Sequence, residues 1–242
     1  MRILVACEES QVVCKAFRER GHEAYSCDII DCSGGHPEWH IKGDVLKILN
    51  PSFQGIFSSW GADFFEGITF HTMDGKLHII DGKWDLIIAH PPCTYLTVTG
   101  NRWFNVERYG EKAIQRLKDR EEAAEFFMAI WNADCAKVVI ENPIGYMNTY
   151  FRKPDQIVHP YYFAEYQGDE NCERKATCLW MRGVPPLKYE IKYQPRVIEY
   201  KNGKGTDSPW HMDTMKLPPA ERAKARSRTY PGMGMAFAEQ WG

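Results

Sequence analysis

Two short apolar runs, each followed at once by polar and reactive side chains, limit the possible folds of this chain more than any other feature. The first run, Trp84 to Ala89, ends at His90-Pro91-Pro92-Cys93, and the second, Val138 to Ile140, ends at Glu141-Asn142-Pro143. Runs of this length are typical of buried strands. Because a long helical pattern separates them, we expect two neighbouring parallel strands whose carboxyl ends line one crevice.

The remaining pattern extends these two strands into an α/β fold. Apolar residues recur at helical spacing from Glu107 to Asp134, which predicts a helix that covers the sheet. The sheet itself should be mostly parallel, with helices on both faces. The other expected elements are strands at Arg2 to Cys7, His22 to Cys27, Gln156 to Phe163 and Thr177 to Met181, and helices at Gln11 to Arg20 and Gly232 to Trp241.

The chain divides into a main domain over residues 1–184, a segment over 185–229 and a closing helix over 230–242. Residues 51–83 are rich in aromatic side chains but have no sustained period, and Asp74-Gly75 is a hairpin-turn signal, so an insertion or lid is expected there. Pro185 to Arg228 holds ten Lys and Arg against five Asp and Glu. The 185–229 segment is therefore predicted to be a small, irregular, basic appendage, suited either to phosphate groups or to solvent.

The bulk composition limits the class of protein. The 242 residues suffice for one α/β domain with a small appendage, and the formal net charge of −2 does not by itself indicate a nucleic-acid binder. We find no apolar run long enough for a transmembrane helix, and the amino terminus reaches two acidic residues too early for a signal peptide. Eight irregularly spaced cysteines do not suggest a disulfide framework. We therefore expect a cytoplasmic protein with mostly reduced thiols and no membrane partner.

The first strand, helix and second strand form the arrangement that holds a nucleotide-like cofactor, with the carboxylate of Asp28 for the ribose hydroxyls. The first turn, Cys7-Glu8-Glu9-Ser10, has no glycine, and its two acids would repel a pyrophosphate. A cofactor that carries a cationic group fits this turn better. No metal is predicted, because the spacing of the nearby thiols and imidazoles matches no common zinc signature: Cys27, Cys32, His36 and His40.

Cys93 and Glu141 together suggest covalent chemistry on a planar ring. A thiolate is a good nucleophile, and an exposed turn near amides or cations lowers the pKa of a cysteine thiol. A carboxyl group whose pKa is raised by burial can hold a proton for a ring nitrogen. A thiolate that adds to carbon 6 of a pyrimidine, while the carboxyl group protonates nitrogen 3, makes carbon 5 nucleophilic enough to take an electrophile.

These motifs resemble those of a known family. His90-Pro91-Pro92-Cys93 looks like the proline-cysteine motif, and Glu141-Asn142-Pro143 looks like the glutamate-asparagine motif, of cytosine carbon-5 DNA methyltransferases. The similarity is greatest to the short methylase-like proteins of phages and prophages, and the order of motifs extends along nearly the whole chain. The resemblance implies a Rossmann-like methyltransferase fold, S-adenosylmethionine as the cofactor and DNA as the partner.

The resemblance also implies roles for individual residues. Cys93 would be the nucleophile, Glu141 would engage ring nitrogen 3, Asn142 would support the loop, and the basic motif would meet the substrate phosphate or orient Glu141: Arg174 and Lys175. The cofactor site would comprise Ala6, Cys7, Glu8, Glu9, Ser10, Asp28, Asp44, His90, Pro91, Gly232, Met233 and Gly234, with the last three in a turn that closes the pocket. Candidate substrate contacts are Pro92, Tyr95, Arg102, Trp103, Trp210 and His211.

Two departures from the family leave the substrate open. The glycine-rich first loop is replaced by Cys7-Glu8-Glu9-Ser10, and the target-recognition domain is reduced to the segment from Pro185 to Thr229. Reading a sequence in the major groove needs several side chains held on a rigid element. Either the target sequence is short and loosely specified, or the substrate is not a duplex. Aromatic side chains could then stack on a flipped or unpaired cytosine.

Other functions also remain open. Pro91-Pro92 before a contact residue resembles the Asp-Pro-Pro-Tyr motif of exocyclic-amino DNA methyltransferases, in which no thiol attack is needed. A pyrimidine-nucleotide modifying enzyme would use the same chemistry on a free nucleotide. A non-catalytic nucleic-acid-binding relative would retain the fold without the activity.

Overall fold

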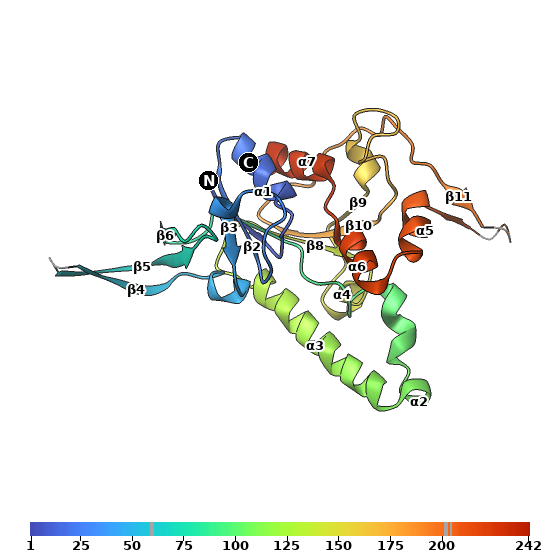
Figure 1. The fold of residues 1–242 in the computed structure, drawn as a ribbon, viewed down its shortest axis with the longest axis horizontal. Coiled ribbons are helices and arrows are strands. Elements are labelled where there is room, and N and C mark those ends of the chain that lie inside the picture. The colour runs from blue at the N-terminus through green and yellow to red at the C-terminus, as the bar shows by residue number, and fades with distance from the viewer. Residues whose placement is uncertain (59–60, 201–202, 204) are drawn as a thin grey trace.

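The computed structural model describes residues 1–58, 61–200, 203 and 205–242, and in this part of the chain a central sheet of seven strands has the order β3-β2-β1-β7-β8-β10-β9 (Figure 1). The first five of these strands are parallel, as predicted, whereas β10 runs antiparallel to both β8 and β9. The strands are β1 (Arg2–Ala6), β2 (Glu23–Asp28), β3 (His40–Lys42), β7 (Leu86–Ala89), β8 (Val138–Pro143), β9 (Gln156–Val158) and β10 (Thr177–Arg182).

Helices cover both faces of this sheet, which confirms the predicted α/β architecture. α1 (Val12–Glu19) and α7 (Pro231–Trp241) lie together on one face, and α3 (Glu111–Trp131) lies on the other (Figure 1). Along β1, Ile3 and Val5 pack toward α1 and α7, whereas Leu4 and Ala6 pack toward α3. Strands buried on both faces are apolar at every position, which explains the continuous apolar runs in the sequence.

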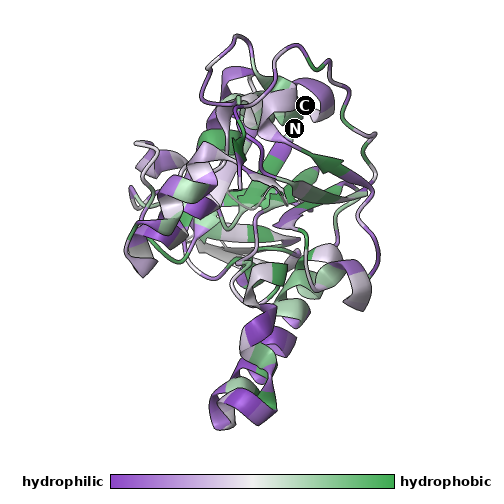
Figure 2. Cartoon of the chain, turned by 90° about the vertical axis from the view of Figure 1, so that its right-hand side faces the viewer, coloured by the Kyte–Doolittle hydropathy of each residue, from purple (hydrophilic) through white to green (hydrophobic). Residues whose placement is uncertain are grey.

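The predicted long helix over 107–134 is wrong in one respect, because it is divided in two. Gly110 has a φ of 53° and separates α2 (Val106–Tyr109) from α3. Side chains at Ala124, Phe127 and Ile130 are fully buried under the sheet, whereas hydrophilic residues predominate on the end of α3 that projects from the molecule (Figure 2). Only the second half of α3 therefore belongs to the core.

Arg182 at the end of β10 holds the carboxyl end of α3. Its guanidinium donates hydrogen bonds to the carbonyl oxygens of Trp131, Ala133 and Cys135, at 2.7, 2.8 and 2.8 Å. The last carbonyls of a helix have no partner within it, and they carry the negative end of the helix dipole. One cation therefore fixes the helix that covers this face of the sheet.

We expect Arg182→Met to lower the free energy of unfolding by about 2–3 kcal/mol, because charge-assisted hydrogen bonds to these carbonyls are lost while the alkyl stem is kept. Urea unfolding followed by circular dichroism measures this change. Arg20→Met is the matched control, since Arg20 makes only an exposed ion pair with Glu239 at 3.9 Å and such pairs contribute about 0–1 kcal/mol. Equal stability of the two variants would contradict the assignment.

The predicted insertion at 51–83 is a separate antiparallel sheet. It consists of β4 (Ser52–Ser58), β5 (Gly61–His71) and β6 (Leu77–Asp81), and β4 and β5 project from the body as a long ribbon (Figure 1). The predicted Asp74-Gly75 turn lies between β5 and β6. At the base of the sheet, Ile68, Phe70 and Ile80 join the core on the α3 side. Residues 59–60, which include one of the aromatic side chains noted in this stretch, lie outside the described residues.

The last third of the chain is more regular than predicted. The 185–229 segment contains β11 (Ile198–Glu199), β12 (Thr206–Asp207), α5 (Pro209–Met215) and α6 (Pro219–Ser227). The strand predicted at 156–163 ends at Val158, because Pro160 begins a 3-10 turn instead. A four-residue helix, α4 (Met147–Tyr150), follows β8, and 3-10 turns span Pro37–Trp39, Val45–Lys47 and Val98–Phe104. None of the helices in the described ranges is long and apolar enough to span a bilayer.

Candidate functional site

The carboxyl ends of β1, β7 and β8 form one row at the edge of the sheet. Ala6 pairs with Ala89, and Ala89 pairs with Ile140, in parallel register. Cys7 and His90 follow β1 and β7, and Glu141, which lies within β8 opposite Leu179 of β10, is the next residue in this row. The predicted convergence of the two strand ends is confirmed at the level of the backbone.

His90 and Glu141 form a direct, largely buried pair. His90 Nδ1 lies 3.0 Å from Glu141 Oε2, and the two side chains are only 10% and 17% exposed. Burial raises the pKa of Glu141, but the hydrogen bond from His90 and the charges of Lys175 and His90 outweigh it and hold this pKa below its ordinary value. The net shift of this pKa is therefore opposite in direction to the effect of burial alone.

Asn142, which lies in β8, joins this strand to the loop that follows β7. Its side-chain nitrogen donates a hydrogen bond to the carbonyl oxygen of Pro91 at 2.8 Å, and the residue is 2% exposed. A second link lies further along, where the backbone N–H of Tyr146 donates to the carbonyl of Leu96 at 2.6 Å. The loop that carries Cys93 is thus tied to the strand that carries Glu141, which agrees with the supporting role predicted for Asn142.

We expect Asn142→Ala to lower the free energy of unfolding by about 1–3 kcal/mol, because it leaves the buried Pro91 carbonyl without a donor. Urea unfolding measures the loss. Asn132→Ala removes an exposed asparagine at the end of α3 and should change stability by less than about 0.5 kcal/mol. If both variants were as stable as the wild type, the Asn142 bond would not hold the loop after β7 to β8.

Cys93 lies in the half-buried turn after the two prolines. Burial raises the pKa of its thiol, the charge of Glu141 raises it further, and Lys175 opposes both. The turn does not lower this pKa as an exposed, cation-rich turn would, because burial has the largest effect and the Glu141 charge adds to it. Cys93 and Glu141 are close enough to interact electrostatically, and the thiol must lose its proton before it can attack.

The predicted basic pair, Arg174 and Lys175, divides between two partners. Arg174 donates to the hydroxyl and the carbonyl of Thr206 at 2.9 and 3.0 Å, so it holds β12. Lys175 donates to the carbonyl of Arg228 at 3.1 Å, and its charge lowers the pKa of both Cys93 and Glu141. Lys175 is the member of the pair that acts on the candidate site.

Glu8 in the first turn caps α1. Its two carboxylate oxygens accept hydrogen bonds from the backbone N–H groups of Val13 and Cys14, at 2.6 and 3.1 Å, and it is 3% exposed. A carboxylate at a helix N-terminus is stabilised by the helix dipole. Glu8 therefore organises the turn from inside, whereas Cys7, Glu9 and Ser10 are partly exposed. The buried side chain of Ala6 belongs to the core.

Acidic and apolar groups meet at the ends of β1 and β2. Burial raises the pKa of the Cys7 thiol, and the charges of Asp28 and Asp44 raise it further, so both predicted carboxyl groups lie near Cys7. Ile29 and Ile30, which follow Asp28, are 74% and 54% exposed. Sequence analysis missed these two residues, whose only signal is an apolar pair directly after the acidic strand end.

This surface fits the cofactor that the resemblance implies. The Asp28 carboxyl group is available for ribose hydroxyls, and the exposed isoleucines offer an apolar surface for a flat base. The acidic surroundings of Cys7 suit a cationic sulfonium with a free amino group. The donor set of this part of the chain is therefore compatible with S-adenosylmethionine.

The helix predicted from Gly232 to Trp241 is confirmed as α7, so the turn expected to close the pocket at Gly232, Met233 and Gly234 is the start of this helix. Met233 is 4% exposed. A Cβ on Gly232 would meet the carbonyl of Phe163 and the side chain of Asn171. The absence of side chains at the two glycines lets α7 pack closely against α1 and its neighbours, which explains their position without a ligand.

The predicted substrate contacts are only partly directed outward. Trp103 is 42% exposed, with the Arg102 guanidinium 4.7 Å from its ring centroid. The ring centroid of Tyr95, in contrast, lies 4.9 Å from the guanidinium carbon of Arg116 in α3. Trp210 contacts the edge of Tyr230 with ring centroids 6.5 Å apart. Pro92 is exposed beside Cys93, and the ring of His211 is bonded to Asp207 at 2.7 Å.

Two arginines of α3 hold the loop after Cys93, and sequence analysis missed this role. The guanidinium carbon of Arg120 lies 3.3 Å from the ring centroid of Phe104, and its Nε donates a hydrogen bond to the carbonyl oxygen of Tyr95 at 3.0 Å. Arg116 donates to the carbonyl of Thr94 at 3.2 Å. Only the path of the loop in three dimensions identifies the partners of these two arginines.

Cys27, His36 and His40, three of the four residues considered as zinc ligands, have other partners. The two ring nitrogens of His40 contact the Ser26 hydroxyl and the Ile30 carbonyl, and His36 contacts Glu38. Within the described ranges, no group of three or more His, Cys, Asp or Glu could hold a metal ion.

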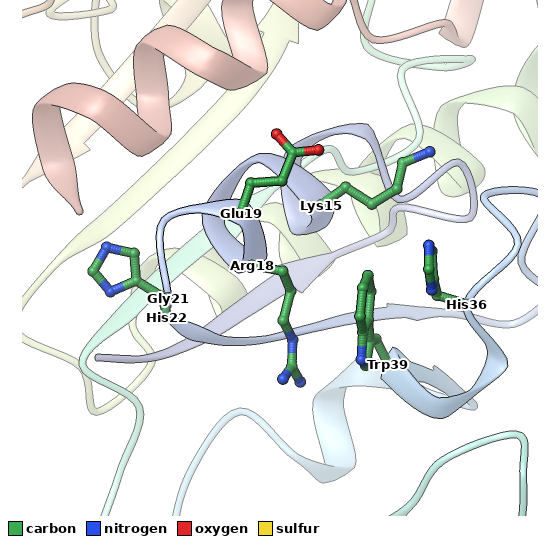
Figure 3. A pocket seen from close by; sticks show the side chains of 7 residues that line it. All are labelled: Lys15, Arg18, Glu19, Gly21, His22, His36 and Trp39. Carbon is green, nitrogen blue, oxygen red and sulfur yellow. The ribbon is translucent and has the colours of Figure 1, made fainter.

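A pocket of about 460 Å³ lies beside α1, away from the strand-end row (Figure 3). Lys15 and Arg18 of the helix point toward it, and His36 is stacked on Trp39 with ring centroids 3.8 Å apart. None of the residues predicted for catalysis or cofactor binding lines this pocket. It is therefore separate from the candidate site.

Comparison with known proteins adds no family and no relative to these geometric observations. No protein-family model matches the chain, and no curated protein matches its sequence.

Proposed function

We propose that this chain is an S-adenosylmethionine-dependent methyltransferase that acts on carbon 5 of cytosine in DNA through a covalent adduct with Cys93. The observation that carries the proposal is the Asn142 to Pro91 hydrogen bond of 2.8 Å, which ties the Cys93 loop to β8, the strand that carries Glu141. This bond brings a nucleophile and an acid to a common edge of the sheet. A catalytic pair needs such fixed mutual geometry more than it needs any single residue type.

The chemistry follows from these two side chains. The Cys93 thiolate attacks carbon 6 of cytosine, and the carboxyl group of Glu141 donates a proton to nitrogen 3, so that negative charge does not accumulate on the ring. Carbon 5 then takes up a methyl group. Loss of the carbon 5 proton and expulsion of the thiolate restore the aromatic ring, and the proton on nitrogen 3 returns to the carboxylate. Lys175 favours the ionised forms of both groups.

S-adenosylmethionine would supply the electrophilic methyl group, and the ends of β1 and β2 would hold it. Asp28 suits the ribose, Ile29 suits the base, and the acidic first turn suits the cationic part. The mostly parallel sheet with one reversed strand and helices on both faces is compatible with a Rossmann-like methyltransferase fold. Ligands of open α/β sheets bind at this carboxyl edge.

A nucleic-acid partner is supported by the basic residues of the 185–229 segment and by the exposed Trp103. α6 carries a basic residue at every second position over part of its length, namely Arg222, Lys224 and Arg226. Cations of this kind contact phosphates without reading sequence, and an exposed aromatic ring can stack on an unpaired base. We therefore expect a flipped or single-stranded cytosine as the substrate, with a short or relaxed target sequence.

An exocyclic-amino methyltransferase is the second candidate, and the raised pKa of the Cys93 thiol favours it. In such an enzyme the Pro91-Pro92 loop would hold the base in its plane without covalent attack.

The test is to incubate the protein with labelled S-adenosylmethionine and a panel of single-stranded DNA, duplex DNA, RNA and mononucleotides, and then to analyse the nucleosides. 5-Methylcytosine in DNA supports the proposal. A methylated exocyclic amine selects the second candidate, and modification of the mononucleotide alone indicates a pyrimidine-nucleotide enzyme. If the protein is folded but binds no cofactor by calorimetry, the proposal fails.

A further inference from the structure

We propose that His90 is a positioning residue that supplies, through Glu141, the proton delivered to ring nitrogen 3 of the bound cytosine. This inference rests on the proposed function. It assigns to His90 a role different from the cofactor contact that the sequence suggested.

The first argument is the geometry of the pair. His90 and Glu141 follow neighbouring parallel strands, and His90 Nδ1 is 3.0 Å from Glu141 Oε2. The backbone N–H of His90 donates to the carbonyl of Ala6 at 2.9 Å, so the histidine is held to β1 as well as to β8. A ring fixed at this distance can pass a proton directly to the carboxylate.

The second argument is the remaining ring nitrogen. His90 Nε2 is buried and has no hydrogen-bond partner among the described residues. A buried polar atom without a partner is uncommon and needs an explanation. While Nδ1 is engaged with Glu141, Nε2 remains the atom at which the ring can take up a proton again after each transfer.

The third argument is the charge around the pair. The titratable groups close enough to be affected by it are Glu8 on the β1 side, Cys93 on its own loop, and Lys175 and Cys178 on the β10 side. The charge of His90 lowers the pKa of both Glu8 and Glu141, so the ring lies between two buried carboxyl groups. Because the pKa of Glu141 is below its ordinary value, that carboxyl group is ionised at neutral pH and needs a donor.

The proton transfer is balanced in each turnover. The protonated His90 gives its Nδ1 proton to the Glu141 carboxylate as Cys93 attacks, and the carboxyl group passes a proton to nitrogen 3 of the ring. When the thiolate leaves and the ring regains its aromatic form, nitrogen 3 returns the proton to Glu141, which returns it to His90. The proton on carbon 5 is lost to a water molecule, so each turnover releases one proton to solvent, and no oxidant or reductant is required.

Two variants separate this role from a structural one. His90→Asn keeps a neutral N–H donor near the position of Nδ1, whereas His90→Ala removes it. We expect methyl transfer by both variants to fall by about 100-fold, the lower end of the range for proton-transfer groups. We also expect the pH optimum of both to move to a more acidic value, because the carboxyl group alone must then hold the proton. His71→Asn, at an exposed position on β5, is the matched control. It should leave the rate of methyl transfer and the pH optimum unchanged.

A second readout does not depend on activity. The 13C carboxyl signal of Glu141, assigned with Glu141→Gln, should titrate at a higher pH in His90→Ala than in the wild type, since the hydrogen bond and charge that lower this pKa are lost. An unchanged titration, or full rescue of the rate by His90→Asn, would overturn the proposal. If the wild type methylates nothing in the substrate panel, the proposed function fails and this inference fails with it. An active wild type with an equally active His90→Asn overturns this inference alone.

Discussion

Cys93→Ala is expected to reduce methyl transfer to cytosine in DNA by at least about 1,000-fold, because no other group can form the bond to carbon 6 once the nucleophile is removed. Incorporation of label from S-adenosylmethionine measures the loss. A second measurement uses DNA that contains 5-fluorocytosine. Fluorine cannot leave carbon 5 as a proton does, so the wild type should remain covalently attached and the variant should not.

The control for this experiment is Cys32→Ala, which removes a partly exposed thiol outside the candidate site. It should retain the full rate and the covalent adduct. Calorimetry with S-adenosylmethionine should give the same affinity for Cys93→Ala and the wild type, which distinguishes loss of chemistry from loss of fold. A Cys93→Ala variant that keeps substantial activity would favour the exocyclic-amino methyltransferase instead.

Glu141→Gln is expected to slow methyl transfer by about 100-fold to 10,000-fold, because an amide can accept or donate a hydrogen bond at nitrogen 3 but cannot transfer a proton to it. Single-turnover rates with saturating DNA measure this effect on the chemical step. The matched control is Glu125→Gln on the exposed face of α3, which should leave the rate unchanged. A rate within tenfold of the wild type would remove Glu141 from the mechanism.

The same substitution has a consequence for stability that depends on pH. The pKa of Glu141 is lower in the folded protein than its ordinary value, so ionisation of this group stabilises the fold above the ordinary pKa of a glutamate. That contribution is lost as the pH falls through the lowered value. The difference in unfolding free energy between the wild type and Glu141→Gln should therefore shrink on acidification, which urea unfolding at several pH values measures.

The strand ends of the candidate site could be predicted from sequence because they follow from simple periodicity. Val138 to Ile140 and Leu86 to Ala89 are continuous apolar runs, and the helical pattern between them requires a parallel crossover. Neighbouring parallel strands end at the same edge, so the convergence of Cys93 and Glu141 needed no knowledge of side-chain contacts. The acidic end of β2 at Asp28 could be predicted for the same reason.

The protonation states could not be predicted, because they depend on neighbours that are distant in sequence. His90 lies on the opposite loop from Glu141, and its hydrogen bond reverses the effect of burial on that carboxyl group. The same carboxylate raises the pKa of Cys93 against the effect of Lys175. The direction of each pKa shift is set by burial together with charges that come from the ends of β7, β8 and β10.

Contacts that depend on close backbone approach were also hidden from sequence analysis. The helix that contains Gly232 and Gly234 was predicted, but the sequence did not show that the lack of a Cβ at these positions permits close packing against Asn171 and Val12. The strand predicted beyond Val158 ended because Pro160 has no N–H for the ladder. The regular elements of the 185–229 segment are short, and each lies below the length at which periodicity is informative.

The two ends of the long helix α3 are connected to different parts of the molecule, and this gives it a mechanical role. Arg182 of β10 donates a hydrogen bond to the final turn of α3. About 20 Å away along the helix axis, at 1.5 Å per residue, Arg116 and Arg120 donate hydrogen bonds to the loop after Cys93. A rigid strut of this kind transmits displacement along its length. A force on the Cys93 loop would therefore be passed through α3 to β10, and substitutions near Trp131 would alter how stiffly that loop resists.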